Sequence, residues 1–464
     1  MTLPPGPSQP PIVQTVQWSL RPLPFMEACA RRYGDVFTLR FHQIGTFVFF
    51  TRPEHIKQIF TGDSEILLSG RANQLLAPLV GSRSVLLLDG KEHLRQRRLL
   101  MPPFHGERML AYAAIMRDTA EAEIERMPLR APFAIHAHMQ AITLDVIMRA
   151  VFGLTSSDDP LEREGERVRR LRGLLVEFIT PPPALIAFLP FAQVDLPGSP
   201  FRAFLRCRES VDRELYALID ERRRAKDLEQ REDILSLMLR ARDEDGQPMT
   251  DRELRDELVT MLVAGHETTA TTLSWAFDQI LAEPRVAKKI DAELARVLGG
   301  RRLEPAALPK LEYLDAVIKE TLRMKPILPI VARELAEPIE IGGHALPAGT
   351  KIAPCIYLAH RRPEVYPEPD RFYPERFVDA KIDPYAWLPF GGSVRRCLGM
   401  AFALYEMKII LATVLSRAHL RLASGEPARI VRRGITLAPS GGTRVILTER
   451  ESAAERGAPA QSAI

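Results

Sequence analysis

The spacing of apolar residues along this 464-residue chain changes its period between segments. Two runs rich in β-branched and aromatic residues, Val36–Phe41 and Thr46–Phe50, are joined by a polar turn and predict a β-hairpin. Helical patterns dominate from about residue 53 to residue 322. Short β-prone segments return over residues 338–357 and 420–447. The pattern therefore predicts a mainly α protein with small peripheral β-sheets.

Proline at the start of the chain and small polar residues at its end suggest how the chain is divided into a domain and two terminal segments. Residues 1–19 are rich in proline and predict an extended segment. No repeat and no Gly/Ser linker interrupts residues 20–449, which we expect to form one domain, although Thr180-Pro181-Pro182-Pro183 predicts a loop within it. Small and polar residues over 450–464 predict a disordered tail.

One helical segment is unusually long. Thr250 and Glu253 form the pattern of a capping box, and the helix that they open can continue to about Leu281, before Pro284. A helix of some 30 residues is about 45 Å long and can cross the whole molecule. Midway lies the sequence Ala264-Gly265-His266-Glu267-Thr268-Thr269, in which glycine costs the helix about 1 kcal/mol. Either a packing glycine with back-bonding threonines or a functional site would explain this stretch.

Composition narrows the class of protein. The chain is 46% hydrophobic and 26% charged, with a net charge of +4 and a pI near 8.9. Acidic and basic residues are interleaved, so nucleic-acid binding is not indicated. The four cysteines show no paired spacing, which favours a reducing compartment. The chain starts without a secretory leader or an apolar run of about 18 residues, so we expect a cytoplasmic protein without a membrane anchor.

The most informative segment is Phe390-Gly391-Gly392-Ser393-Val394-Arg395-Arg396-Cys397-Leu398-Gly399. It places Cys397 in a glycine-rich turn before an apolar helix over 400–416. A helix N-terminus and nearby arginines favour a thiolate, and glycines allow a flat ligand to approach the backbone. No second cysteine or histidine is close in sequence, so a single axial bond to a haem iron fits better than a zinc cage. The alternative to a haem ligand is that Cys397 is a buried cysteine with a structural role only.

This segment resembles the haem-binding signature of the cytochrome P-450 family, Phe-x-x-Gly-x-Arg-x-Cys-x-Gly. Phe390, Arg395, Cys397 and Gly399 match, whereas Ser393 stands where the family usually has glycine. A serine at a position that needs positive φ would cost on the order of 1 kcal/mol. The resemblance covers roughly residues 20–449. It implies the triangular fold of the family, haem b (iron protoporphyrin IX) as cofactor, and Cys397 as the axial iron ligand.

Other motifs extend the resemblance. The sequence around Gly265 is similar to the family's Ala/Gly-Gly-x-Asp/Glu-Thr-Thr/Ser motif, which implies that Thr268 is the catalytic alcohol and Glu267 the acid that connects it to a proton supply. His266 occupies the variable position and is interpreted as a helix-face residue. His93 and Arg97, spaced i and i+4, match the family's propionate-binding pattern. Arg333 and Arg395 complete the implied propionate clamp.

Two further segments resemble structural motifs of the family. Glu320 and Arg323 lie three residues apart, on one helix face, and match Glu-x-x-Arg. Arg376, in Pro374-Glu375-Arg376-Phe377, matches the partner segment. The resemblance implies a buried ion triad behind the cysteine loop that supports folding and haem retention. By contrast, we interpret Arg95, Arg98, Arg301 and Arg302 as solvated charges, some of which belong to a basic docking face for an acidic redox protein.

The resemblance implies a soluble, bacterial-type monooxygenase that inserts one oxygen atom from O₂ into a C–H bond. The chain has no nucleotide-binding signature, so electrons must come from a separate ferredoxin or flavodoxin and its NAD(P)H reductase. Aliphatic segments suggest a lipophilic substrate, such as a fatty acid, terpenoid or polyketide, and we expect a monomer. The predicted pocket residues are Ala264, Gly265, Ile327, Ile330 and Leu437, within wider candidate walls at 75–88, 178–191, 261–269, 327–331 and 437–440.

Two other functions stay open on the sequence. A peroxide-using or rearranging haem-thiolate enzyme would need no reductase, but such proteins commonly lack the acid–alcohol pair. A non-catalytic haem sensor or carrier would need neither the Gly265 groove nor Thr268. Reductant-dependent oxygen consumption separates the three.

Overall fold

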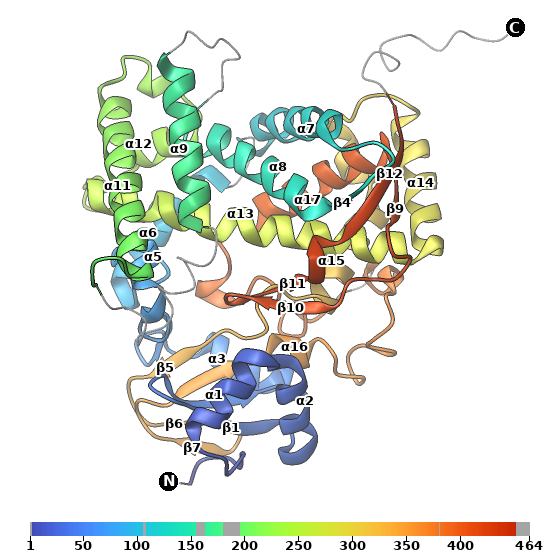
Figure 1. The fold of residues 1–464 in the computed structure, drawn as a ribbon. Helices are drawn as coiled ribbons and strands as arrows, with labels where there is room; N and C mark the ends of the chain where they lie inside the picture. The colour runs from blue at the N-terminus through green and yellow to red at the C-terminus, as the bar shows by residue number, and fades with distance from the viewer. Residues whose placement is uncertain (1, 105–107, 155–162, 180–194, 380, 452–464) are drawn as a thin grey trace, which may run out of the picture.

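The computed structural model describes residues 2–104, 108–154, 163–179, 195–379 and 381–451. A helical part contains most of the chain, and a smaller part rich in strands lies against one end of it (Figure 1). This architecture confirms the predicted mainly α fold with small sheets. Within the described residues, no helix is both long and apolar enough to span a bilayer. The predicted loop at 180–183 and residues 452–464 of the predicted tail 450–464 lie outside the described residues, whereas Arg450 is the last residue of a strand rather than part of a disordered tail.

Most of the helices lie in the segments where the apolar periodicity predicts helix. They are α1 (Pro11–Leu20), α2 (Pro22–Tyr33), α3 (Pro53–Thr61), α4 (Ser69–Ala72), α5 (Ala77–Val80), α6 (Gly90–Leu100), α7 (Arg108–Arg126), α8 (Ile135–Ala150), α9 (Arg163–Ile179), α11 (Pro200–Arg224), α12 (Ile234–Arg240), α13 (Asp251–Ala282), α14 (Pro284–Leu298), α15 (Glu312–Met324), α16 (Ile356–Ala359) and α17 (Met400–Leu415).

The N-terminal segment differs from the prediction of an extended chain. Residues Pro11–Leu20 form α1, and α2 follows directly from Pro22. Proline is compatible with both helices because it lies in their first turns, where its missing N–H would have had no intrahelical partner. The proline content of this segment therefore marks two helix starts rather than an extended structure.

In the part of the chain that the structure describes, the strands form four small sheets. The predicted hairpin is present as β1 (Val36–Phe41) and β2 (Gly45–Phe50), paired antiparallel. It belongs to a five-stranded sheet of order β1-β2-β8-β5-β3, in which β2 and β8 are parallel. The other sheets have the orders β4-β12-β9, β10-β11 and β6-β7. The remaining strands are β3 (Leu67–Leu68), β4 (Pro132–Ala134), β5 (Arg333–Leu335), β6 (Ile339–Ile341), β7 (His344–Leu346), β8 (Lys351–Pro354), β9 (Ala418–Leu422), β10 (Ile430–Arg433), β11 (Thr436–Pro439) and β12 (Arg444–Arg450).

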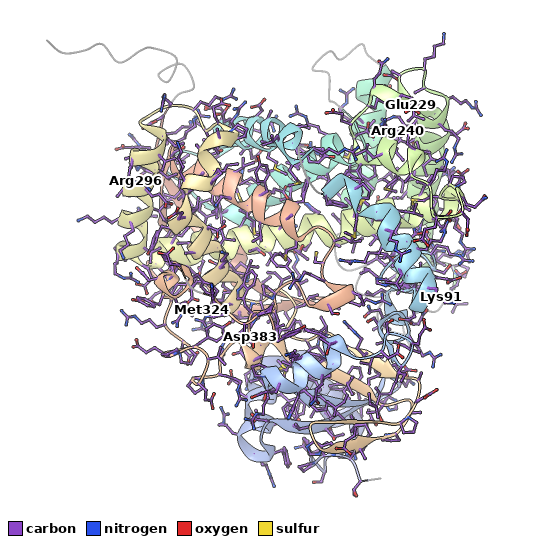
Figure 2. The ribbon with its side chains drawn as sticks, turned by 180° about the vertical axis from the view of Figure 1, so that it is seen from behind. Lys91, Glu229, Arg240, Arg296, Met324 and Asp383 are labelled. Atoms are coloured by element: carbon purple, nitrogen blue, oxygen red, sulfur yellow. The ribbon has the colours of Figure 1, made fainter. Side chains whose placement is uncertain are left out.

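Helix α13 crosses the middle of the helical part (Figure 1). Its N-terminus is the predicted capping box, because the Thr250 hydroxyl accepts from the Glu253 N–H and the Glu253 carboxylate accepts from the Thr250 N–H. Buried side chains along α13 pack into one large apolar cluster with α7, α8, α15 and α17. Seen from behind, the segment around Asp383, which leads to the cysteine loop, lies where the helical and strand-rich parts meet (Figure 2).

Candidate active site

The segment before α17 folds into a tight loop that presents Cys397. The Cys397 N–H donates to the Phe390 carbonyl at 2.9 Å, and the Arg396 N–H donates to the Ser393 carbonyl at 3.0 Å. Gly392 has no room for a side chain, since a Cβ there would lie 2.5 Å from the Phe60 ring. Ser393 has φ 53°, so the predicted strain at this position is present.

The Cys397 residue is accessible although protein atoms surround its thiol. Its residue surface is exposed, yet burial raises the pKa of the thiol above its ordinary value, and the lowering by the Gly399 N–H and Arg97 does not offset this. Exposure and desolvation agree only if the sulfur borders a space enclosed by protein. In the described residues, no group of three or more His, Cys, Asp or Glu side chains is arranged to hold a metal ion.

The electrostatic reasoning from the sequence was wrong in one respect. Arg395 and Arg396 were expected to favour the thiolate. Arg395 instead donates to the Val85 and Leu88 carbonyls and pairs with Asp89 at 2.7 Å, while Arg396 is exposed. Arg97 is the arginine that acts on Cys397. Coordination of a metal removes the proton of a thiol outright, so a metal at this position would provide what the arginines do not.

Four basic side chains gather beside this loop. Burial and the charges of Arg395, Arg97 and Arg333 lower the pKa of His93 to about 3. Burial, with Arg395 nearby, lowers the pKa of Arg333 to about 10, and burial lowers the pKa of Arg395 to about the same value. These shifts indicate mutual repulsion in a region of low dielectric constant.

The cluster carries more positive charge than the described carboxylates neutralise. Asp89 pairs with Arg395, but the guanidinium groups of Arg97 and Arg333 form no ion pair within the described residues. Arg97 donates to the Arg396 carbonyl at 2.7 Å, and Arg333 donates to the carbonyl of Ala332 at 2.8 Å. Buried cations need counter-charges. A thiol on a hollow, next to an excess of buried cations, fits a flat iron cofactor with two carboxylate arms.

The middle of α13 forms another wall of accessible space. Ala264 is exposed although residues 254–260 and 269–280 on either side of it are buried, and Gly265 and Thr268 are partly exposed. A Cβ at Gly265 would meet only the Ile147 side chain, at an ordinary 3.5 Å, so packing among the described residues does not require this glycine. The Thr268 hydroxyl donates to the Ala264 carbonyl. This is the back-bonding expected if the segment had only a structural role.

Glu267 points to neighbouring elements. Its carboxylate accepts from Gln140 Nε2 of α8 at 2.7 Å and lies 3.6 Å from His136 Nε2 and 3.5 Å from the Arg433 guanidinium. Burial raises the pKa of Glu267, but His136, Arg433 and Gln140 outweigh it and hold the pKa below its ordinary value. The adjacent His266 is buried against Thr143, with Nδ1 2.8 Å from the hydroxyl, and burial lowers its pKa to about 4.

A buried ion cluster lies behind the cysteine loop. The Arg323 guanidinium donates to both carboxylate oxygens of Glu320, at 2.7 and 2.8 Å, and both side chains are fully buried. Arg376 donates to the same carboxylate at 3.1 Å, and the Tyr373 N–H does so at 3.0 Å. Every oxygen of Glu320 therefore has a partner, as a buried charge requires.

His360 links this cluster to the cysteine loop, and the sequence reasoning missed it. Arg323 donates to the His360 carbonyl at 2.8 Å, and the Leu388 N–H donates to Nε2 of the ring at 2.8 Å. The Nε2 atom is thus an acceptor, so Nδ1 carries the proton and donates to the Arg323 carbonyl at 3.0 Å. Burial and the charge of Arg323 lower the pKa of His360 to about 3. No sequence signal distinguishes it from an ordinary loop histidine.

The predicted pocket residues do not all lie on accessible space. Ala264 and Gly265 do, as described above. Leu437 and Ile327 are buried, at 3% and 8% exposure, and are joined by a hydrogen bond from the Leu437 N–H to the Ile327 carbonyl at 2.9 Å. Leu437 packs with Ile330 in the apolar cluster below α13. Residues 180–191 of the candidate wall 178–191 lie outside the described residues.

Three of the arginines interpreted as solvated charges have carboxylate partners in the structure. Arg95 is two-thirds buried and pairs with Asp243 at 2.6 Å and with Glu253, in the capping box of α13, at 2.9 Å. Arg302 pairs with Asp118 at 2.7 Å and with Glu121. Arg98 is exposed and pairs with Glu244. Arg95 therefore makes a tertiary contact between α6 and α13. It does not belong to the proposed docking face.

Comparison with known proteins gives consistent results. The profile of the family described as Cytochrome P450 matches residues 4–444. Cytochrome P450 135B1 of Mycobacterium tuberculosis is 41% identical over 466 residues, which cover 100% of this chain and 95% of the relative. Cytochrome P450 135A1 of the same organism is 38% identical over 449 residues, 96% of this chain and 95% of the relative. The solved structure of the cyanobacterial CYP120A1 with bound retinoic acid has a TM-score of 0.83 at 25% identity, over 97% of this chain and 100% of that one.

Proposed function

Because the chain belongs to the cytochrome P450 family, we propose that it inserts one oxygen atom from O₂ into a C–H bond of a lipophilic substrate. The family comprises haem-thiolate monooxygenases, in which a cysteine thiolate binds the haem iron. The observation that carries the proposal is the pairing of the Cys397 thiol on an internal hollow with the partly exposed middle of α13, where an acid and an alcohol adjoin.

Cys397 is the proposed axial ligand of haem b. The positive charges of Arg97 and Arg333, which form no ion pair among the described residues, lie next to Arg395 and His93 and support the assignment of these four residues to the two propionates. When bound, haem supplies the activation of dioxygen and the one-electron chemistry. The protein holds the group, excludes water and controls the protons.

Proton control is assigned to α13. The hydroxyl of Thr268 lies at the accessible middle of the helix, and its donated bond to the Ala264 carbonyl leaves its oxygen free to accept a further hydrogen bond. Glu267 is held as a carboxylate by its contacts with α8 and β10, so it is ready to take up a proton and to pass it toward Thr268.

The buried cluster of Glu320, Arg323 and Arg376 is proposed to hold the cysteine loop in place. His360 joins it to Leu388, two residues before the loop begins at Phe390. Loss of one partner of such a cluster costs about 3–5 kcal/mol because a charge is left buried without compensation. Its role is folding and haem retention rather than chemistry.

A lipophilic substrate is supported by the aliphatic character of the wall around Ala264 and by the retinoic acid, an apolar chain with one carboxylate, in the structural relative CYP120A1. Fatty acids, terpenoids and polyketide-like compounds are the substrate classes that we propose. Each should shift the ferric haem spectrum from low to high spin on binding. A panel in which only small polar compounds cause the shift would contradict the substrate class but not the reaction class.

A separate ferredoxin or flavodoxin with its NAD(P)H reductase is the proposed electron donor. The surface next to the cysteine loop supports this, because it has a cavity of about 260 Å³ with two cationic residues and an apolar floor. Its lining residues are Lys319, Phe377, Ile382, Pro384, Trp387, Phe390, Gly391, Arg396 and Met400. An acidic partner should dock here, and turnover should weaken with salt, which screens charges beyond about 10 Å at 0.1 M.

Oxygen consumption by the holoenzyme tests the reaction class. With reductase, ferredoxin and a spin-shifting substrate, oxygen uptake should require NAD(P)H and give an oxygenated product. Product formed from peroxide alone would favour the peroxide-using alternative. A haem protein that consumes no oxygen and forms no product under either condition would favour the sensor or carrier.

A further inference from the structure

The surroundings of Glu267 include an element that the acid–alcohol pair does not explain. His136, the second residue of α8, places its Nε2 atom 3.6 Å from the Glu267 carboxylate and 3.2 Å from the Thr271 hydroxyl. Its Nδ1 atom lies 3.4 Å from a guanidinium nitrogen of Arg433 in β10, and the same nitrogen lies 3.5 Å from the Glu267 carboxylate. Because arginine only donates, Nδ1 is the acceptor, and the proton of the neutral ring is on Nε2, toward Glu267.

His136 also lines a cavity. The cavity has a volume of about 230 Å³, is partly open, and is bounded by the β10–β11 hairpin and the Gly441–Gly442 turn. Gly442 leaves room for the ring, since a Cβ there would lie 3.0 Å from the His136 Cβ. Figure 1 shows α13 between α8 and the β10–β11 hairpin, and the cavity is lined by His136 of α8 together with residues of that hairpin.

We propose that His136 is a positioning residue that relays protons between this cavity and the Glu267 carboxylate. A hydronium ion in the cavity transfers a proton to Nδ1, in place of the bond from Arg433, and leaves as water. The proton on Nε2 then moves to the Glu267 carboxylate, which becomes the neutral acid, so one proton enters and one leaves the ring without change of oxidation state. Reversal of the imidazole tautomer then resets the relay. The proposal rests on the proposed function, in which Glu267 supplies protons to the site.

The chemistry of the neighbours singles out His136. Gln140 and Arg433 also contact the carboxylate from other elements, but an amide does not titrate, and arginine does not deprotonate in proteins. The other charged or titratable groups close by are His266 on α13 and Arg432 on the cavity wall. His266 and His136 are both buried, but His266 bonds to Thr143 and is not among the residues that line the cavity.

The first test needs no turnover. Deuterium exchange at the imidazole Cε1–H of each histidine, measured by mass spectrometry on the resting holoenzyme in heavy water, uses water itself as the probe. His136 should exchange at least several-fold faster than the buried control His266. Equal, slow exchange at both residues would overturn the proposal, because water would not reach His136 from the cavity.

The second test separates the relay from the function of Glu267. His136→Gln keeps a hydrogen-bond donor but cannot relay a proton, so it should raise the fraction of electrons lost to peroxide several-fold and flatten the dependence of coupling on pH. His138→Gln, on the same helix but paired with Glu123 at 2.7 Å, is the matched control and should behave as the native protein. Retention of the reduced carbon monoxide spectrum shows that each variant keeps its haem.

Glu267→Gln completes the comparison. If it uncouples the enzyme and His136→Gln does not, the relay is wrong and the proposed role of Glu267 stands. If neither variant uncouples, the role of Glu267 in the proposed function fails, and the relay fails with it. If Glu267→Gln and His136→Gln both uncouple the enzyme and His138→Gln does not, the result supports the role of Glu267 and the relay through His136.

Discussion

Glu257 of α13 gives a quantitative prediction about stability. Its side chain is fully buried, and one oxygen accepts from the Val85 N–H at 2.7 Å and from Gln96 Nε2 at 3.0 Å. The other oxygen has no hydrogen-bond partner among the described residues. Burial raises the pKa of Glu257 from its ordinary 4.5 to about 8, against the lowering by these two bonds. The side chain is therefore protonated at neutral pH in the folded protein.

The direction in which the free energy of unfolding changes with pH follows from proton linkage. Between the unfolded pKa of 4.5 and the folded pKa of about 8, the folded protein binds more protons at Glu257 than the unfolded chain. Stability from this group is thus fully present below pH 4.5 and is lost as the pH rises toward 8. At about 1.4 kcal/mol per pKa unit, the loss between about pH 5 and pH 8 is about 3 kcal/mol.

Glu257→Gln removes the titration but keeps the acceptor for Val85 and Gln96. Its amide nitrogen takes the place of the unpartnered oxygen and costs about 1–3 kcal/mol at every pH. The diagnostic is therefore the slope: the free energy of unfolding of the variant, relative to the native holoenzyme, should rise by about 3 kcal/mol from about pH 5 to pH 8. Burial also raises the pKa of Glu406 to about 8, but that residue is present in both proteins and cancels.

Urea unfolding of the holoenzyme, followed by far-ultraviolet circular dichroism at several pH values, measures this difference. Glu312→Gln, an exposed acid at the start of α15, is the control and should give a curve parallel to that of the native protein. If the Glu257→Gln curve were also parallel, Glu257 would be ionised in the fold, and the reasoning from burial would be refuted.

Three further predictions concern the site. Cys397→Ser should abolish the thiolate-type spectrum of the reduced carbon monoxide complex, and persistence of that spectrum would make another cysteine the ligand. Thr268→Ala should keep the spectrum but divert electrons to peroxide, whereas Glu320→Gln should lower the yield of holoprotein, because about 3–5 kcal/mol is lost from the buried cluster; equal haem loss in both would contradict this division of roles. Ser393→Gly should raise stability by about 1 kcal/mol, measured by the urea midpoint, since serine is strained at φ 53°; no increase would show that the loop compensates for the strain.

Features that depend on short sequence spacing were predictable. The capping box of Thr250 and Glu253 lies within one helical turn, and its two hydrogen bonds follow from backbone geometry once the helix starts there. The positive φ of Ser393 was predicted through the family resemblance, because the family usually has glycine at this position. The β1–β2 hairpin followed from two short β-prone runs joined by a turn with Gly45.

Features that depend on the approach of distant segments were decided by the tertiary structure. From the sequence, the charge of Arg95 is compatible with a solvent-exposed helix face. Only the packing of α6 against α13 pairs Arg95 with Glu253, 158 residues away. His360 becomes the link between the ion cluster and the cysteine loop because its segment is buried beside Arg323.

The surroundings of Glu267 show the same limit. The motif identified the acid, but His136 is 131 positions earlier and Arg433 is 166 positions later in the chain. The periodicity of a sequence fixes which face of a helix is apolar, since that depends on neighbours three and four residues away. It does not fix which polar groups of other elements meet a buried carboxylate, because that depends on how the helices and the β10–β11 hairpin pack together.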